Sequence, residues 1–228
     1  MSEWWTYRLS DLLMFSKATY FRLFELLNLA LWPLQLLVLG IGIAVLICLA
    51  QGGARAGRTA ALLLALAWLH VAWNYFAQRY ATINTGAPYF AIGFALQAVL
   101  LLWLASRKKA PRLTQPDGAL GKLGLIVAIL ALLGYPLLAP LGGRPWAGAE
   151  LFGLAPDPTV ALSLAALLLW RAGASMWIVP LLWCAISTAT LVELHAGQAW
   201  VLPVLALLAA GGRLSTAMRS RSRGSGAQ

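Results

Sequence analysis

Long apolar segments without charged residues, separated by short polar ones, constrain this chain's fold more than any other feature. The first segment, residues 27–50, contains no Asp, Glu, Lys or Arg. As a helix rising about 1.5 Å per residue, it is long enough to cross a hydrocarbon core about 30 Å thick. Hydrophobic residues make up 61% of the chain and charged residues only 11%, whereas soluble domains are about half apolar. The sequence therefore predicts an all-α polytopic membrane protein.

About seven segments of the chain are apolar enough to form transmembrane helices. We expect these helices near residues 27–50, 59–78, 88–105, 123–141, 159–170, 172–192 and 196–211. The fifth, residues 159–170, is short, and the number of spans falls to six if this helix does not cross the bilayer.

Three regions follow from this pattern. Residues 1–26 mix aromatic and charged side chains, so we expect an amphipathic interfacial helix with Ser10 as its N-cap, or else a simple lead-in to the first span. Residues 27–212 form the transmembrane bundle. Residues 213–228 are basic and rich in Ser and Gly, which predicts a disordered cytoplasmic tail.

The charged residues between the apolar segments indicate the orientation. With the N-terminus outside, cytoplasmic segments hold twelve of the 17 Lys and Arg residues, and outer segments hold six of the 7 Asp and Glu residues. An excess of Lys and Arg is usual on the cytoplasmic side, so we expect a cytoplasmic C-terminus. The net charge of +10 does not predict a nucleic-acid partner, because the basic residues are not gathered on one polar face.

Two of the expected helices, residues 59–78 and 88–105, are predicted to form an antiparallel hairpin joined by a polar seam. Residues spaced by four share one helical face, and each helix carries such a set: His70, Asn74 and Gln78 on the first, and Tyr89, Gly93 and Gln97 on the second. The hairpin pairs Gln78 with Tyr89, Asn74 with Gly93, and His70 with Gln97. The seam either lines a functional cavity or only holds the bundle together, typically at about 0.6 kcal/mol per hydrogen bond.

Arg79 lies at the outer end of the second helix, where positive charge is disfavoured, and Glu193 is its expected partner. The two form an anion-binding or gating pair, or an interfacial ion pair without a further role; a snorkelling arginine is a third interpretation. Because polar residues concentrate in the outer halves of the segments, we predict a polar cavity open to the outside. Its lining comprises His70, Asn74, Gln78, Arg79, Tyr89, Gln97 and Glu193.

Motifs for catalysis and cofactor binding are absent from the sequence. There is no Walker loop, GxSxG elbow or HExxH motif, so we expect no enzymatic activity. Cys48 and Cys184 lie in apolar segments without metal-ligand spacing and are interpreted as buried apolar side chains. His195 lies too far in depth from His70 to share a haem with it. No metal or other cofactor is expected, and the seventh segment lacks the lysine of a retinal protein.

Three stretches of the chain resemble a family of bacterial multi-pass membrane proteins, domain-of-unknown-function family 6064. They are SDLLMFSKATYFRLFELLNLALWPLQ, NYFAQRYATINTGAPYFAIGFALQ and AELFGLAPDPTVAL. The resemblance covers most of the chain up to the basic tail and implies a bacterial inner-membrane protein. It carries over no activity, ligand or catalytic residue.

Two functions remain open at this point. The one-sided polarity favours a transporter or channel for a small solute or ion, with its site in the outer half of the bilayer. The alternative is a non-catalytic membrane subunit or assembly factor that docks onto a larger complex through its apolar faces. The expected partners are the lipid bilayer and either a small solute or other membrane subunits.

Overall fold

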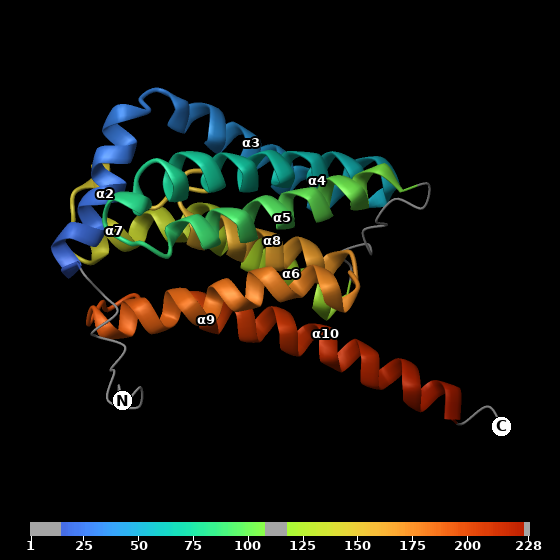
Figure 1. The fold of residues 1–228 in the computed structure, drawn as a ribbon. Helices are drawn as coiled ribbons and strands as arrows, with labels where there is room; N and C mark the ends of the chain where they lie inside the picture. Colours follow the sequence, from blue (N-terminus) through green and yellow to red (C-terminus); the bar gives the residue numbers. More distant parts are fainter. Residues whose placement is uncertain (1–14, 108–117, 226–228) are drawn as a thin grey trace, which may run out of the picture.

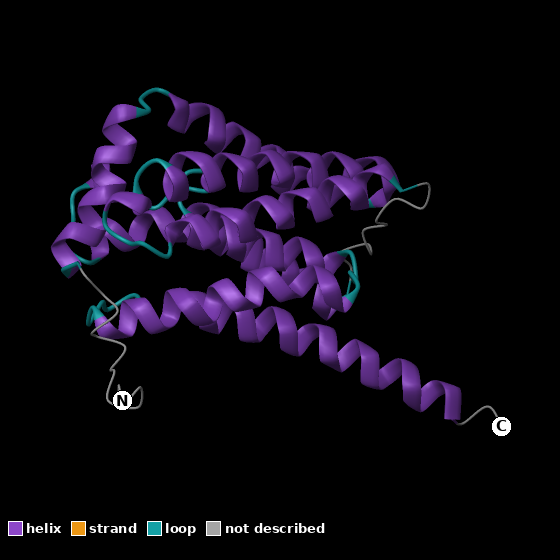
Figure 2. Cartoon of the chain, in the orientation of Figure 1, coloured by secondary structure: helices purple, strands orange, loops and turns teal. Residues whose placement is uncertain are grey.

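The computed structural model describes residues 15–107 and 118–225, and within these residues all regular structure is helical (Figure 2). The principal helices are α2 (Lys17–Ala30), α3 (Leu34–Gln51), α4 (Gly53–His70), α5 (Ala87–Ser106), α6 (Ala119–Ile129), α7 (Leu138–Leu141), α8 (Pro156–Leu169), α9 (Ile178–Glu193) and α10 (Val201–Ser225). The predicted all-α architecture is confirmed.

Five helical stretches among the described residues are long and apolar enough to cross a membrane. They are Leu34–Gln51, Gly53–Thr82, Ala87–Ser106, Ala119–Leu141 and Ala174–Glu193. Pro156–Leu169 and Val201–Ser215 are apolar but shorter, and they correspond to the expected fifth and seventh spans. Many large apolar side chains on the outer helices are exposed, including those of Leu36, Ile92 and Leu207. Such a surface is compatible with a membrane protein.

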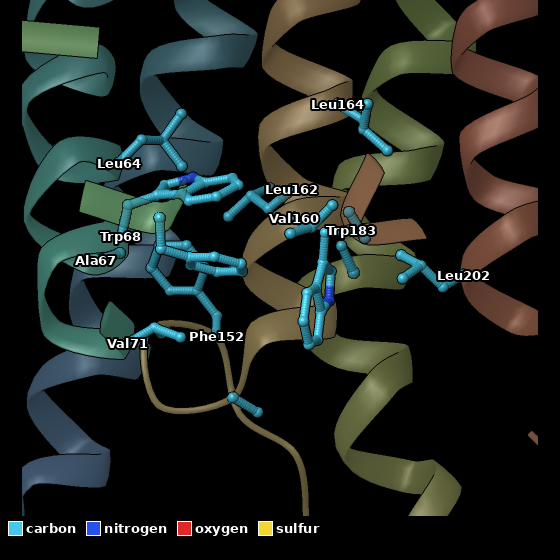
Figure 3. Close-up of a cluster of buried hydrophobic side chains, with 14 of the residues drawn as sticks. Leu64, Ala67, Trp68, Val71, Phe152, Val160, Leu162, Leu164, Trp183 and Leu202 are labelled. Carbon is cyan, nitrogen blue, oxygen red and sulfur yellow. The ribbon is translucent and has the colours of Figure 1, made fainter. Parts of the chain in front are cut away.

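Helix α8 occupies the centre of the bundle, where it packs against α4, α6, α9 and α10 (Figure 1). Every residue from Pro156 to Leu169 is buried. Since its side chains are apolar nearly all round, α8 has no face suited to water, and this pattern is typical of a helix enclosed by protein. Figure 3 shows Val160, Leu162 and Leu164 of α8 between Trp68 of α4 and Leu202 of α10.

The expected first span, residues 27–50, is two helices rather than one. Helix α2 ends at Ala30 and α3 begins at Leu34, with Pro33 between them. Proline lacks a donor and its ring clashes with the preceding turn, so the helix breaks there. Helix α2 therefore lies across one end of the bundle, steeply inclined to α3 (Figure 1).

Helix α2 begins at Lys17. Its N-cap is Ser16, whose Oγ accepts a hydrogen bond from the Thr19 amide at 3.2 Å. The predicted cap, Ser10, lies outside the described residues. The inner face of α2 buries Tyr20, Phe24 and Leu27, so this helix is an integral part of the core.

A π-helical segment, Val71–Ala77, continues α4. Its register is set by bonds such as that from the Gln78 amide to the Trp73 carbonyl, at 3.1 Å. The buried side chains keep spacings of three and four through this segment, with Leu64, Trp68, Val71 and Tyr75 on one face. Asn74 is half-buried beside that face, and Gln78 is exposed.

Residues 213–228, expected to form a disordered tail, are helical as far as Ser225. The segment from Arg213 to Arg223 contains no Gly or Pro to break the helix. The C-terminal half of α10 thus extends beyond the bundle (Figure 1).

Replacing Gly42 with Ala is expected to lower the free energy of unfolding by about 1–3 kcal/mol relative to Gly40→Ala. A Cβ atom at Gly42 would lie 2.4 Å from Leu132 Cδ1 and 3.0 Å from Phe152 Cδ1, whereas nothing lies within 4 Å of one at Gly40. Both changes gain the same helix propensity, about 1 kcal/mol, so their difference reports packing. Denaturant unfolding of both proteins in detergent measures it. Equal stabilities would contradict this contact.

Candidate functional site

Asp157, in the first turn of α8, is a fully buried carboxylate. Gly153, with φ of 74°, turns the chain toward the interior just before α8. The Thr159 hydroxyl then accepts from the Gly153 amide at 2.8 Å and donates to the Ala155 carbonyl at 2.7 Å. These bonds fix the start of α8, where the positive end of the helix dipole favours a negative side chain.

Three side chains from neighbouring elements donate hydrogen bonds to Asp157. Trp183 Nε1 on α9 lies 2.8 Å from Oδ1, and Ser187 Oγ, also on α9, lies 2.8 Å from Oδ2. The Tyr135 hydroxyl, from the 3₁₀ turn before α7, is 3.4 Å from Oδ2. An ionised carboxylate only accepts hydrogen bonds, so this set of donors matches its needs.

A second buried acid, Glu150, lies in the loop before α8 and is only 2% exposed. Gln198 Nε2 donates to Glu150 Oε1 at 2.7 Å, and Arg144 Nη2 lies 3.5 Å from the same oxygen. Arg144 Nη2 also donates to Gln198 Oε1. Arg144, Glu150 and Gln198 therefore form a closed polar triad, which we call the Arg144 triad.

The pKa of Glu150 is raised to about 7. Burial is the main cause, because it disfavours the charged carboxylate, and the negative charge of Asp157 acts in the same direction. Hydrogen bonds from Gln198 and Arg144, together with the charge of Arg144, oppose this increase. The loop thus holds a carboxyl group that titrates near neutral pH.

A pocket of about 360 Å³ opens over the Arg144 triad. Its lining residues are Lys17, Phe21, Leu138, Leu141, Gly142, Arg144, Ala196, Gly197, Gln198 and Val201. A neighbouring hollow of about 530 Å³ shares Lys17, Phe21 and Arg144 with it. The Arg144 guanidinium carbon lies 3.9 Å from the centre of the Phe21 ring. Lys17 Nζ donates to the His195 carbonyl at 3.0 Å, which ties α2 to the turn before α10.

Aromatic side chains of α2, the π segment and the 3₁₀ turn after it form a cluster near the two acids. Tyr75 stacks on Phe24 at 5.3 Å and on Tyr80 at 5.5 Å between ring centres. Burial, and then the charges of Tyr75, Asp157 and Glu150, raise the pKa of Tyr20 well above its usual value. The acids are therefore close enough to act electrostatically on a side chain of α2.

The seam residues His70 and Gln97 have partners other than each other. His70 Nδ1 is 2.7 Å from the Gly153 carbonyl, in the turn that leads into α8. Gln97 is fully buried and donates to the Met176 carbonyl at 3.2 Å. Both side chains bind backbone groups of other elements, so the predicted His70–Gln97 pairing is wrong.

The remaining residues of the predicted cavity are not brought together. Arg79 Nη1 donates to the Asn74 carbonyl within its own segment, at 2.8 Å. No Arg79–Glu193 ion pair is present in the described part of the chain, where Glu193 is half-buried. Gln78 is exposed, and Tyr89 is 76% exposed. His70, Asn74 and Gln78 lie beside the face that Leu64, Trp68, Val71 and Tyr75 form, so the predicted seam is not the face that the bundle encloses.

Sequence reasoning did not single out Arg144, Glu150 and Asp157. One signal was available: two of the chain's 7 acidic residues lie in the largely apolar stretch AELFGLAPDPTVAL. An ionisable residue in such a setting is rare and is usually functional. Among the described residues, no group of three or more His, Cys, Asp or Glu side chains could hold a metal ion.

Ser187→Ala is expected to lower the free energy of unfolding by about 1.5–3 kcal/mol, because it removes a hydrogen bond to a buried carboxylate. The matched change on α9 is Thr190→Val, since the Thr190 hydroxyl donates to the Ile186 carbonyl of its own helix at 2.9 Å. It should cost less than about 1 kcal/mol. Thermal unfolding in detergent compares the two, and a cost at Thr190 equal to that at Ser187 would count against the Asp157 contact.

Glu150 should make the protein less stable as the pH rises from 4.5 to about 7. Its pKa is about 7 when folded and 4.5 as the reference value, so in this window the folded state holds more protons than the unfolded state. The predicted loss is roughly 3 kcal/mol across the window. Unfolding measured at several pH values tests this in the wild type and in Glu150→Gln, which should lose this part of the slope. Parallel curves for the two proteins would contradict the prediction.

Residues 17–222 match a family of unknown function, DUF6064. The match covers the bundle and confirms the resemblance seen in the sequence. No match is found among curated proteins or solved structures.

Proposed function

The chain belongs to the DUF6064 family, and we propose that it is an integral membrane protein that moves a small solute or ion across the bilayer. Its polar site is the Arg144 triad together with Asp157. This proposal keeps the predicted function but moves the site from the α4–α5 hairpin to the start of α8.

The proposed topology has seven passes, with α8 and α10 as the two shorter ones. Arg58 Nη2 donates to the Arg107 carbonyl at 3.3 Å, so the basic first turns of α4 and the residue after α5 share one end of the bundle. Lys17 and Arg144 lie at the other end with the turn 194–200. The excess of basic residues favours a cytoplasmic position for the first end. The Arg144 triad then faces outward, in the bacterial inner membrane.

The full burial of Asp157 is the observation that carries this proposal. An ionisable group inside a membrane bundle is costly, and such groups usually mark substrate or ion pathways. Here the acid lies at the N-terminus of α8, next to a helix interrupted by the π segment Leu130–Gly134 and the 3₁₀ turn Tyr135–Leu137. Sites built from interrupted helices and helix ends are typical of transporters.

A non-catalytic subunit is the second candidate. Helix α3 favours it, because only 22% of its residues are buried and its apolar face is wide enough to hold another membrane helix as well as lipid. We propose no catalytic role, since the donors around Asp157 satisfy the carboxylate rather than activate a nucleophile.

Purified protein in liposomes should take up a transported probe, which radiolabelled probes measure after the liposomes are separated from the medium. Suitable probes are Na⁺, K⁺, acetate, hexanoate, phosphate and glutamate. We expect uptake of at least one probe with the wild type and with Thr190→Val. Asp157→Asn and Glu150→Gln should lower it at least tenfold.

Two variants of the site are used because Asp157→Asn removes a buried charge that organises α9. Folding of each variant is checked by thermal unfolding before reconstitution. If folded wild-type protein gives no uptake above that of empty liposomes for any probe, the transport proposal fails and the subunit role is left.

A further inference from the structure

We infer that the pocket over the Arg144 triad binds a small amphiphilic anion, with a carboxylate or phosphate head, and that Glu150 takes up a proton when the anion binds. This inference rests on the proposed transport site and specifies its substrate class and its coupling ion.

The pocket combines positive charge with an apolar wall. Lys17 and Arg144 supply the charge, and Phe21, Leu138 and Val201 supply apolar surface. A volume of about 360 Å³ is within the usual range for small-molecule sites, about 300–1,000 Å³. The lining contains no carboxylate, so a cation would find no counter-charge at its surface. A short acyl or alkyl anion suits both kinds of lining.

Arg144 connects the pocket to the buried acid. Its guanidinium lies in the pocket wall and reaches Glu150 Oε1 at 3.5 Å, a long contact, and the Gly148 carbonyl at 3.3 Å. A guanidinium has five N–H donors in a planar fork, which binds carboxylates and phosphates in a bidentate manner. An anion in the pocket therefore competes with Glu150 for the same cation.

Losing Arg144 leaves Glu150 buried without its counter-charge. The other groups that interact electrostatically or by hydrogen bonds with Glu150 are the Asp157 carboxylate, the Gln198 amide and the hydroxyls of Tyr20, Tyr75 and Tyr135. Lys17 and His195 lie across the pocket on α2 and the turn before α10, and Lys17 would also be drawn to the anion. With Asp157 as the nearest remaining charge, a proton on Glu150 is the simplest way to restore neutrality.

Linkage between the two events fixes the direction of the pH dependence. If the anion raises proton affinity at Glu150, a proton raises anion affinity by the same factor. Since the pKa of Glu150 is about 7, affinity should be nearly constant below pH 7. Above it, affinity should fall by up to tenfold per pH unit, with close to one proton taken up per anion.

Calorimetric titration of the full chain in detergent, after removal of lipid, tests both parts. The probes are hexanoate, hexyl phosphate and, as the cationic control, hexylammonium. Titrations at pH 6, 7 and 8, in buffers of different ionisation enthalpy, count the protons. We expect the anions to bind and hexylammonium not to bind, with about fivefold weaker hexanoate binding at pH 8 than at pH 7.

Two variants and a matched control assign the effects to residues. Arg144→Gln should weaken hexanoate binding at least tenfold, while Arg79→Gln, an arginine at the same end that binds only its own segment, should not change it. Glu150→Gln resembles the protonated acid, so it should bind with pH-independent affinity and no proton uptake. Equal binding of hexylammonium, or unchanged binding in folded Arg144→Gln, overturns the anion site. Anion binding without proton uptake in the wild type overturns the coupling.

The source of the anion is distinguished by dihexanoyl phosphatidic acid, which presents a phosphate on a lipid. Binding at least tenfold tighter than hexyl phosphate identifies a lipid headgroup as the natural ligand, and weaker binding identifies a free solute. These titrations need no membrane crossing. Anion binding without uptake into liposomes therefore refutes transport alone, and uptake without anion binding refutes this inference alone.

Discussion

The burial of a carboxylate at the start of a wholly enclosed helix is the constraint on which the rest of this structure depends. Removing a charge from water costs several kcal/mol unless donors replace the lost hydration. Asp157 meets this requirement with Trp183 and Ser187 of α9 and with Tyr135. Those bonds determine how α9 and the turn before α7 stand against α8, so a single acid sets the arrangement of the bundle at this end.

Apolar side chains hold the rest of α8 in place within the bundle. Its remaining surface meets apolar side chains of α4, α6, α9 and α10, while the outer helices present exposed leucine and isoleucine side chains. Within a membrane, apolar contacts gain little over lipid, and packing with a few hydrogen bonds gives specificity. The bond from Trp68 Nε1 to Ser163 Oγ, at 2.8 Å, is such a contact. It holds α4 against α8 at Ser163, further along α8 than Asp157.

Much of the helical pattern could be predicted from hydrophobicity alone, because long uncharged segments have few alternatives in a membrane. The polar seam could not, because the face of α4 and the π segment that the bundle buries is the apolar one with Trp68, Val71 and Tyr75. Asn74 lies beside that face, and Gln78 is exposed. The acid site could have been suspected from Glu150 and Asp157 in an apolar stretch. Their connection to Arg144 and Gln198 could not, because it depends on how a loop folds back onto the turn before α10.

The two acids have different surroundings, and this difference suits different tasks. Asp157 is held by neutral donors that belong to the bundle itself, so its hydrogen bonds are a fixed part of the fold. Glu150 is held by one arginine that also faces a pocket, so its counter-charge can be drawn away. Below the acids, Trp68 and Phe94 lie 4.2 Å apart between ring centres and close the interior. For the proposed transport, a solute that enters over Arg144 would have to pass α8, which requires α8 to move relative to its neighbours. The π and 3₁₀ turns between α6 and α7, which lack regular α-helical hydrogen bonding, are the elements best suited to accommodate that motion.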